Sequence, residues 1–281
     1  LKPGGLVYVS YNCMPGWAGL EPFQRLLREH AKGNPARSDH QAESGMAFIQ
    51  KMREANLGYF TQNPRVAQVL DRKKGKDTAY LAHEYLNDTW QPFFFPDVAE
   101  DMSAAKLDFI GSASLLENFE RICLPKAARE AVADVGEGPL REMLKDYAIN
   151  QQFRRDIYIK GPQPLTGPEK IEALHDLPFY PMVTRDQVTF NFRTPLGEGT
   201  GRADIYQPMV EHLWGGDYSL RNIAKKRKID FNHSVQVIAA LIDNSYLHPG
   251  RIDADAAPAR RFNAAISRKV LFGKPYHYVA A

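Results

Sequence analysis

The sequence has few cysteines, no long hydrophobic run and no strong excess of charge. Only Cys13 and Cys123 occur among its 281 residues, which fits a reducing compartment better than a disulfide-stapled secreted domain. No apolar run approaches the roughly 20 residues that span a bilayer, and no signal peptide opens the chain. We therefore expect a cytoplasmic protein without a membrane partner.

Neither sign of charge dominates the sequence. The 36 basic and 33 acidic residues give a formal net charge of +3, so no global field attracts polyanions. With 44% hydrophobic residues the chain can bury a sizeable core, and its length suits one large domain or two smaller ones.

Motifs for metal and dinucleotide binding are also missing. The sequence holds no HExxH and no CxxC, so we predict no metal site. No GxGxxG follows a predicted strand early in the chain. The glycines of residues 197–201 come after a late strand and are better interpreted as a hairpin loop. We therefore expect that this chain binds no cofactor by itself.

The first residues predict a turn followed by a buried strand. Residues 2–5 (KPGG) are typical of a tight turn, and residues 6–11 (LVYVSY) form a β-branched and aromatic run. A turn this strong usually follows another element, and the chain starts with Leu rather than Met. We therefore expect that sequence is missing upstream.

Helical periodicity dominates the next part of the chain, with strands expected at 107–110 and 157–159. Helix starts are indicated by first-turn prolines and by apparent capping boxes, namely Pro22, Pro139, Ser38 with Gln41, and Asp97 with Glu100. A cluster of glycine and proline at 161–168 marks a domain boundary.

Beyond that boundary an alternating strand at 187–193 precedes three short helices at 208–214, 219–226 and 232–243. This arrangement suggests a winged-helix-like unit. The predicted fold is α+β and predominantly helical. Its domains are residues 1–20, the end of a Rossmann-like sheet with one remnant strand; 21–160, a helical middle domain; and 161–281, the winged-helix-like domain.

Two segments carry a resemblance to a known family. The opening LKPGGLVYVSYN resembles the element of class I methyltransferases that forms the fifth strand of the cofactor-binding sheet. Residues 86–112 (LNDTWQPFFFPDVAEDMSAAKLDFIGS) resemble the methyltransferase regulatory domain that follows this core in a bacterial family. Residues 150–154 (NQQFR) are similar to these proteins as well. The resemblance covers most of residues 1–160.

The resemblance implies a function as well as a fold. The family joins this region to an N-terminal domain that binds S-adenosylmethionine (SAM), and some relatives methylate lysines of proteins. SAM is therefore implied for the full-length protein, while this chain would supply regulation and substrate recognition without catalysing alone. Its partners would be the SAM-binding domain and a macromolecular methyl acceptor, for which protein is one candidate.

Three candidate substrate-binding residues lie at or just after the first predicted strand. In doubly wound sheets, ligands bind beyond the carboxyl ends of the strands, where Tyr11, Asn12 and Trp17 would lie. Aromatic rings attract a lysine ammonium by about 0.5–2 kcal/mol, and an amide oxygen can accept its hydrogen bond. Packing alone would equally explain Tyr11 and Trp17.

Asn87 and Trp90 are the remaining candidates. The polar pair Asn87 and Asp88 beside the indole of Trp90, before the proline-bounded aromatic run PFFFP, suits the wall of a substrate pocket. Packing of the helix that follows explains these residues more simply. The catalytic residues themselves cannot be assigned from this sequence.

Two other classes of function stay open. The basic run Lys225–Lys228 between two predicted helices would touch phosphates in a DNA-binding winged-helix regulator, although the following helix offers no arginine to read guanine. A solvated turn explains the run better, so we do not expect nucleic-acid binding. The amphipathic helices between residues 21 and 86 would alternatively suit a structural module that forms a homodimer.

Overall fold

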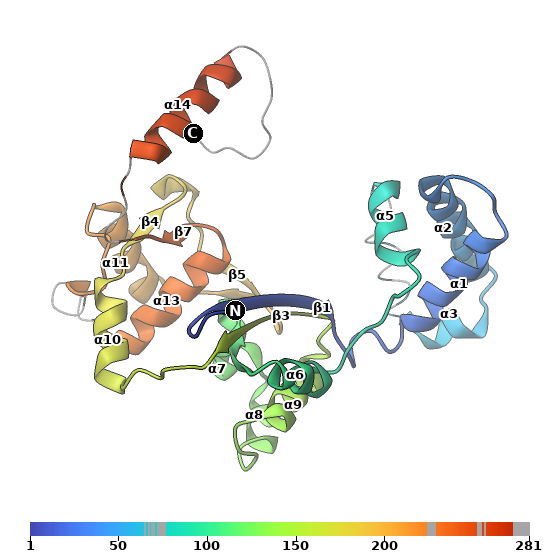
Figure 1. Ribbon diagram of the computed structural model, residues 1–281, viewed down its shortest axis with the longest axis horizontal. Coiled ribbons are helices and arrows are strands. Elements are labelled where there is room, and N and C mark those ends of the chain that lie inside the picture. Colours follow the sequence, from blue (N-terminus) through green and yellow to red (C-terminus); the bar gives the residue numbers. More distant parts are fainter. Residues whose placement is uncertain are drawn as a thin grey trace. The chain divides into compact units, whose positions relative to one another are not determined.

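Two compact units make up the protein. The computed structural model describes residues 1–64, 66, 68, 71, 77–223, 229–251, 255 and 257–271. Unit 1 comprises residues 1–113 and 124–162, and unit 2 comprises residues 114–123 and 163–281. Helices predominate and the sheets are small and antiparallel, so the structure is a mixed α and β fold (Figure 1). The division into domains 1–20, 21–160 and 161–281 stays a prediction.

A three-stranded antiparallel sheet lies in unit 1. Its strands are β1 (Leu6–Asn12), β2 (Leu107–Ser112) and β3 (Phe153–Lys160), in the order β1-β3-β2. The pairing of β1 with β3 runs from Leu6 opposite Ile159 to Asn12 opposite Phe153. The register of β2 shifts between Phe109 and Gly111. Because β3 is central, β1 has no strand on its other side in the described part of the chain.

The helices of unit 1 are α1 (Glu21–Lys32), α2 (Ser38–Glu54), α3 (Gly58–Gln62), α5 (Thr78–Tyr85), α6 (Phe95–Ala104), α8 (Lys126–Ala131) and α9 (Pro139–Ile149). Pro22 and Pro139 lie in first turns, as predicted, where the missing N–H would have no partner in any case. The two predicted capping boxes are wrong. Arg37 and Phe94 occupy the N-caps of α2 and α6, and neither side chain caps its helix.

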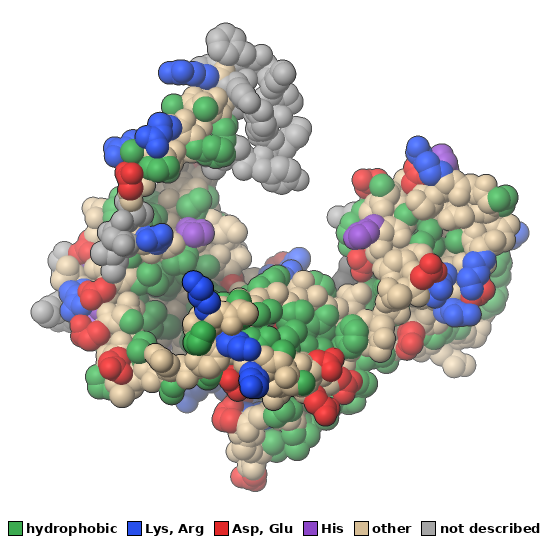
Figure 2. Space-filling view, in the orientation of Figure 1, with side chains coloured by type: hydrophobic (Ala, Val, Ile, Leu, Met, Phe, Trp, Pro, Cys, Tyr) green, Lys and Arg blue, Asp and Glu red, His purple; other side chains and the backbone are tan. Residues whose placement is uncertain are grey.

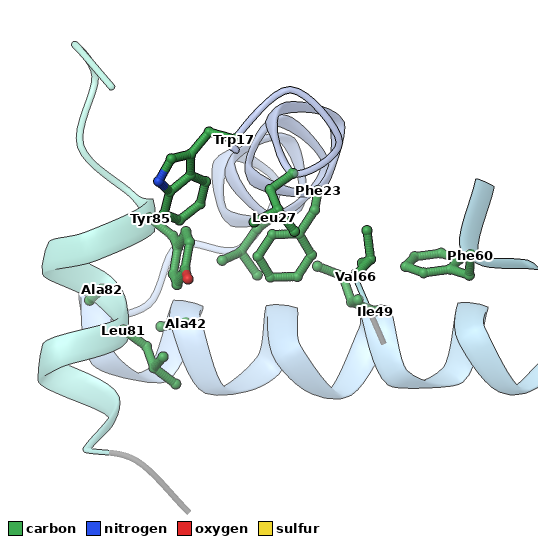
Figure 3. Packing of buried hydrophobic residues seen from close by; sticks show 11 residues of the cluster. Trp17, Phe23, Leu27, Ala42, Ile49, Phe60, Val66, Leu81, Ala82 and Tyr85 are labelled. Atoms are coloured by element: carbon green, nitrogen blue, oxygen red, sulfur yellow. The ribbon is translucent and has the colours of Figure 1, made fainter. Parts of the chain in front are cut away.

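A hydrophobic core joins α1, α2 and α5. Phe23 and Leu27 of α1 are fully buried against Ile49 of α2 and Tyr85 of α5 (Figure 3). The rings of Phe23 and Tyr85 meet edge to face, with centroids 5.4 Å apart. This core includes Trp17, so the helical region begins to pack directly after β1 ends.

Unit 2 contains η1 (Leu115–Asn118), α7 (Glu120–Cys123), α10 (Gly167–Asp176), β4 (Phe179–Pro181), η2 (Arg185–Gln187), β5 (Asn191–Thr194), β6 (Gly197–Thr200), α11 (Ala203–Trp214), α13 (Phe231–Asp243), β7 (Leu247–Pro249) and α14 (Ala257–Leu271). Strands β5 and β6 pair as an antiparallel hairpin, which confirms the predicted hairpin, but Gly197 and Gly199 lie in strand β6 rather than in its loop. Strands β4 and β7 pair antiparallel beside a core of α11 and α13 residues. The basic run Lys225–Lys228 lies outside the described residues.

Among the described residues, no helix is both long and apolar enough to cross a bilayer.

Candidate functional site

The last residues of β1 face opposite sides of the sheet. Tyr11 points to the inner face, which α6 and α9 cover, and its hydroxyl donates a 2.7 Å hydrogen bond to Asp156 Oδ2. Asn12 belongs to the outer face, and its carbonyl oxygen accepts a 2.9 Å bond from the N–H of Phe93. The two neighbours therefore belong to different surroundings.

Arg154 of β3 is the centre of a buried charge network on the inner face. Its Nη1 donates to Asp146 Oδ1 at 2.7 Å, its Nη2 to Glu142 Oε2 at 2.9 Å, and its Nε to Asp156 at 3.0 Å. The guanidinium carbon also lies 4.3 Å from the ring centroid of Phe95 on α6. A single side chain thus connects β3 with α6 and α9, in a setting where each charge has a partner.

Two further groups extend the network. Lys145 Nζ lies 2.6 Å from Glu142 Oε1, and the thiol of Cys13 approaches Asp146 Oδ2 at 3.6 Å. Tyr11 at the end of β1 joins the network through Asp156 of β3, and Cys13, just after β1, joins it through Asp146 of α9. Three carboxylates here face two cationic side chains.

Burial and the neighbouring cations shift the pKa values of the three carboxylates in opposite directions. Burial raises the pKa of Asp146 to about 6, against the opposing effect of the Arg154 charge. Burial raises the pKa of Asp156 too. For Glu142, burial is outweighed by Lys145 and Arg154, so its pKa is lowered. Asp146 is therefore the member of the network whose charge changes closest to neutral pH.

Tyr11 and Cys13 are both held in their neutral forms. Burial, together with the nearby Asp156, raises the pKa of Tyr11, and burial with Asp146 raises that of Cys13. A thiol needs its thiolate form to act as a nucleophile. Cys13 is therefore a packing and hydrogen-bonding residue in this structure.

Trp17 and Trp90 meet in a second cluster. Their ring centroids are 5.1 Å apart in an edge-to-face arrangement, and Trp17 Nε1 donates a 2.6 Å bond to the carbonyl of Gln152. The indole nitrogen of Trp90 is buried without a hydrogen-bond partner among the described residues. The pair closes one end of the core shown in Figure 3, where Trp17 lies beside Tyr85.

Asn87 lies elsewhere, on the surface after α5. Its side-chain amide is 3.5 Å from the carbonyl oxygen of His83. With His83 and Arg37 it lines an open surface cavity of about 580 Å³ between the start of α2 and α5. The structure thus brings Trp17 and Trp90 together, whereas Tyr11, Asn12 and Asn87 occupy three other places. Their assignment to substrate binding stays a prediction.

The outer face of the sheet carries several exposed apolar side chains beside polar ones such as Arg155, and no element in the described part of the chain covers it. Leu6 and Tyr8 of β1 are 61% and 56% exposed, Ile110 of β2 is 52% exposed, and Phe153 of β3 is 40% exposed. Hydrophobic side chains are visible along the strip that β1 occupies (Figure 2). Isolated exposed apolar residues are ordinary, whereas contiguous apolar patches are typical of interaction surfaces.

The free edge of β1 adjoins this face. The backbone N–H of Lys160 donates to the carbonyl of Gly5, and the backbone N–H of Cys13 donates to the carbonyl of Gln152. These two bonds fix which residues of β1 form hydrogen bonds with β3. Val7, Val9 and Tyr11 therefore bond to β3, while the N–H and C=O groups of Leu6, Tyr8 and Ser10 point to the open edge.

Strand β3 buries its charged side chains and exposes its apolar ones. Arg154, Asp156 and Tyr158 are buried on the inner face, whereas Phe153 is exposed and Ile157 only half-buried on the outer face. The period of two in this strand is visible in the sequence. The expectation for residues 150–154 rested only on their family resemblance, and it missed the network because nothing in the sequence shows that α9 turns its carboxylates toward β3.

No group of three or more His, Cys, Asp and Glu side chains in the described ranges could hold a metal ion.

Comparison with known proteins identifies the class of domain that contains this network. Residues 77–160 match the family model of a predicted methyltransferase regulatory domain. The match begins at the N-cap of α5 and ends with the last residue of β3. The chain therefore contains a methyltransferase-related domain.

Two curated relatives are similar to longer parts of the chain. The Synechocystis protein named "Uncharacterized protein sll1526" is 32% identical over 288 residues, which covers 100% of this chain and 57% of the relative. "Uncharacterized protein RP789" of Rickettsia prowazekii is 24% identical over 160 residues, covering 55% of this chain and 28% of the relative.

Solved structures of PKMT2 from Rickettsia typhi share the fold. The TM-score is 0.57 for one structure, at 19% identity, and 0.59 for its complex with AdoHcy, at 18% identity. Each match covers 90% of this chain and 53% of PKMT2. This chain thus spans little more than half the length of PKMT2 and of the Synechocystis relative.

Proposed function

We propose that this chain is the substrate-recognition and regulatory portion of a SAM-dependent methyltransferase, and that it works joined to a SAM-binding domain. The observation that carries the proposal is the sheet of unit 1, which has a free edge at β1 and an apolar outer face without cover in the described residues.

The free edge gives the joining surface. An unpaired strand edge presents a row of N–H and C=O groups that can pair with a further strand. Leu6, Tyr8 and Ser10 offer such groups, so the sheet of the SAM-binding domain can continue through β1 into β3 and β2. The remnant strand expected from the sequence is then the junction between the two sheets.

The outer face supports the same conclusion. Sheets in α/β proteins are covered by helices on both faces, and strand faces against those helices are apolar. The inner face already has α6 and α9, whereas Leu6, Tyr8 and Ile110 on the outer face are exposed to solvent. A helix of the SAM-binding domain would fit there.

The cofactor and the acceptor are proposed from the likeness to PKMT2. PKMT2, which shares the fold, is seen in complex with AdoHcy, and AdoHcy is what SAM becomes after it gives up its methyl group. We assign SAM to the other domain and a protein lysine to the acceptor. Asn12, at the carboxyl end of β1 on the outer face, is then the predicted site residue best placed to meet that lysine.

Several finer expectations belong to the same proposal. Unit 2 would be a winged-helix-like module built on α11 and α13. The protein would act in the cytoplasm, and it could also form a homodimer. These features concern the whole protein rather than the sheet.

Calorimetric titration of SAM tests the division of labour. The full-length Synechocystis relative should bind SAM, and this chain under the same conditions should not. Binding by this chain alone would overturn the proposal, because it would mean a cofactor site within these residues. Absence of binding by the relative would remove SAM from the function.

Amide hydrogen exchange tests the junction itself. In this chain the amides of Leu6, Tyr8 and Ser10 should exchange fast, whereas those of Val7 and Val9 should be protected by β3. At the aligned positions of the full-length relative, both sets should be protected. Fast exchange at the three outward positions in the relative would show that β1 is not a junction.

A further inference from the structure

The course of the chain between the two units points to a regulatory connection. Residues 114–123, here called the crossover segment, belong to unit 2, although the residues on both sides of them belong to unit 1. The segment leaves β2 and returns through Leu124, which is buried. It also lies in the middle of residues 77–160, the part that matches the regulatory domain.

Asp243 holds the crossover segment in unit 2. Its two carboxylate oxygens accept hydrogen bonds from the N–H groups of Leu115 and Leu116, at 3.0 and 2.9 Å. Leu116 is buried beside Phe192 and Ala240. The carboxylate therefore caps the short helix η1, and the leucine anchors it in an apolar surface.

The position of Asp243 shows that it serves η1 rather than its own helix. It is the last residue of α13, where the helix dipole disfavours a negative charge. The two N–H groups of η1 compensate for that cost, because an exposed helix start favours a carboxylate.

The chain connection between the crossover segment and β2 is short. Ala113 donates a 2.8 Å hydrogen bond to the carbonyl of Arg155 on β3, and Leu115 already bonds to Asp243. Only Ser114 separates these two attachments. The covalent connection from η1 to the end of β2 is therefore short, and β2 pairs there with Asp156 of the buried network.

We propose that unit 2 regulates the sheet through the crossover segment. While Asp243 and Leu116 hold the segment, β2 stays fixed on β3 and Asp156 stays in place to hold Tyr11. Release of the segment frees the end of β2 and loosens the network under the end of β1. The coupling itself depends only on this chain, and its importance for an acceptor site rests on the proposed function.

Hydrogen–deuterium exchange on this chain tests the coupling with Asp243→Ala. The amides of residues 107–112 should exchange about tenfold faster, which corresponds to about 1.4 kcal/mol, because the segment loses its hydrogen bonds to a charged group. Helix α13 should keep its protection, since it loses an unfavourable charge. Asp204→Ala, an exposed acidic position of unit 2 on α11, is the matched control and should leave β2 unchanged.

A second variant, Leu116→Ala, removes the anchor by a substitution outside α13 and should produce the same change in β2. If the crossover segment exchanges faster while β2 does not, the segment is docked without coupling and the inference is wrong. If neither changes in either variant, Asp243 and Leu116 do not hold the segment, which also overturns it. SAM binding plays no part in this experiment, so its failure is distinct from failure of the proposed function.

Discussion

The two faces of the β1-β3-β2 sheet differ in a way that contradicts simple expectation. The inner face buries Arg154, Asp156 and Tyr11, and the outer face exposes Leu6 and Tyr8. Charge is tolerated inside because each group has a partner at hydrogen-bond distance. The apolar side chains outside have no cover in the part of the chain that the structure describes. Burial in this sheet therefore follows the supply of partners rather than the polarity of the residue.

The largest difference between the faces should appear at two adjacent arginines. Arg154→Met leaves Asp146, Asp156 and Glu142 without their common cation and should lower the free energy of unfolding by about 3–5 kcal/mol. Arg155→Met, one residue further along on the outer face, should change it by about 0.5 kcal/mol. Urea unfolding of both variants checks this. Equal losses would show that the network contributes little.

Titration of Asp146 should give the next largest effect. Its pKa of about 6 lies above the value of about 3.9 in an unfolded chain, so the folded state keeps a proton that the unfolded state has released. The stabilisation of the folded state by this retained proton is complete below about pH 4 and is lost as the pH rises to 6. The loss is about 2–3 kcal/mol, from roughly 1.4 kcal/mol per pKa unit.

Urea unfolding between pH 4 and 7 measures that loss as the difference between the wild type and Asp146→Asn. The variant should lack the fall in stability, while Asp108→Asn, at an exposed position of β2, should keep it. Parallel pH profiles for the wild type and Asp146→Asn would contradict the assignment.

A smaller contrast separates two tyrosines of β1. Tyr11→Phe removes one donor from the buried Asp156, which Arg154 still holds, and should cost about 1–2 kcal/mol. Tyr8→Phe on the outer face should change the stability by less than about 0.5 kcal/mol. Thermal unfolding followed by circular dichroism would detect the difference, and a larger loss for Tyr8→Phe would reverse the assignment of the faces.

The smallest effect on stability is expected on the outer face, where binding rather than folding should respond. Leu6→Lys with Tyr8→Lys should change the free energy of unfolding by about 0.5 kcal/mol or less but reduce the fluorescence of bound anilinonaphthalene sulfonate. Val7→Lys, which points to the inner face, should destabilise the chain by about 2 kcal/mol or more. Unchanged dye binding in the double variant would argue against an open apolar surface.

Local signals in the sequence predicted much of the fold. Pro22 and Pro139 marked helix starts because a first-turn proline costs no hydrogen bond, and the glycines of residues 197–201 marked a hairpin. The apparent capping boxes failed because Ser and Asp side chains can satisfy the pattern without lying at the N-cap. At Asp97 the helix had already begun with Phe95 and Pro96.

The site was less predictable, because its parts meet only in the folded chain. Tyr11 was selected for its place at a strand end, but its partner Asp156 lies 145 residues away. Arg154 and Asp156 are typical of solvent-facing positions in a strand whose other face carries Phe153, Ile157 and Ile159. That pattern predicts burial of the apolar face, and the described residues do not include a segment that would bury it.

The three passages of the chain between the units also limit how the gene can be cut. Residues 77–160 look like a module that can be excised, yet β3 would then lose β1 along one side. The crossover segment would also lose its hydrogen bonds to Asp243 and the apolar contacts of Leu116 with Phe192 and Ala240. A truncation placed at residue 160 therefore removes structure from the region it is meant to isolate. Shuffling of this domain between proteins, in the laboratory or in evolution, has to carry both units together.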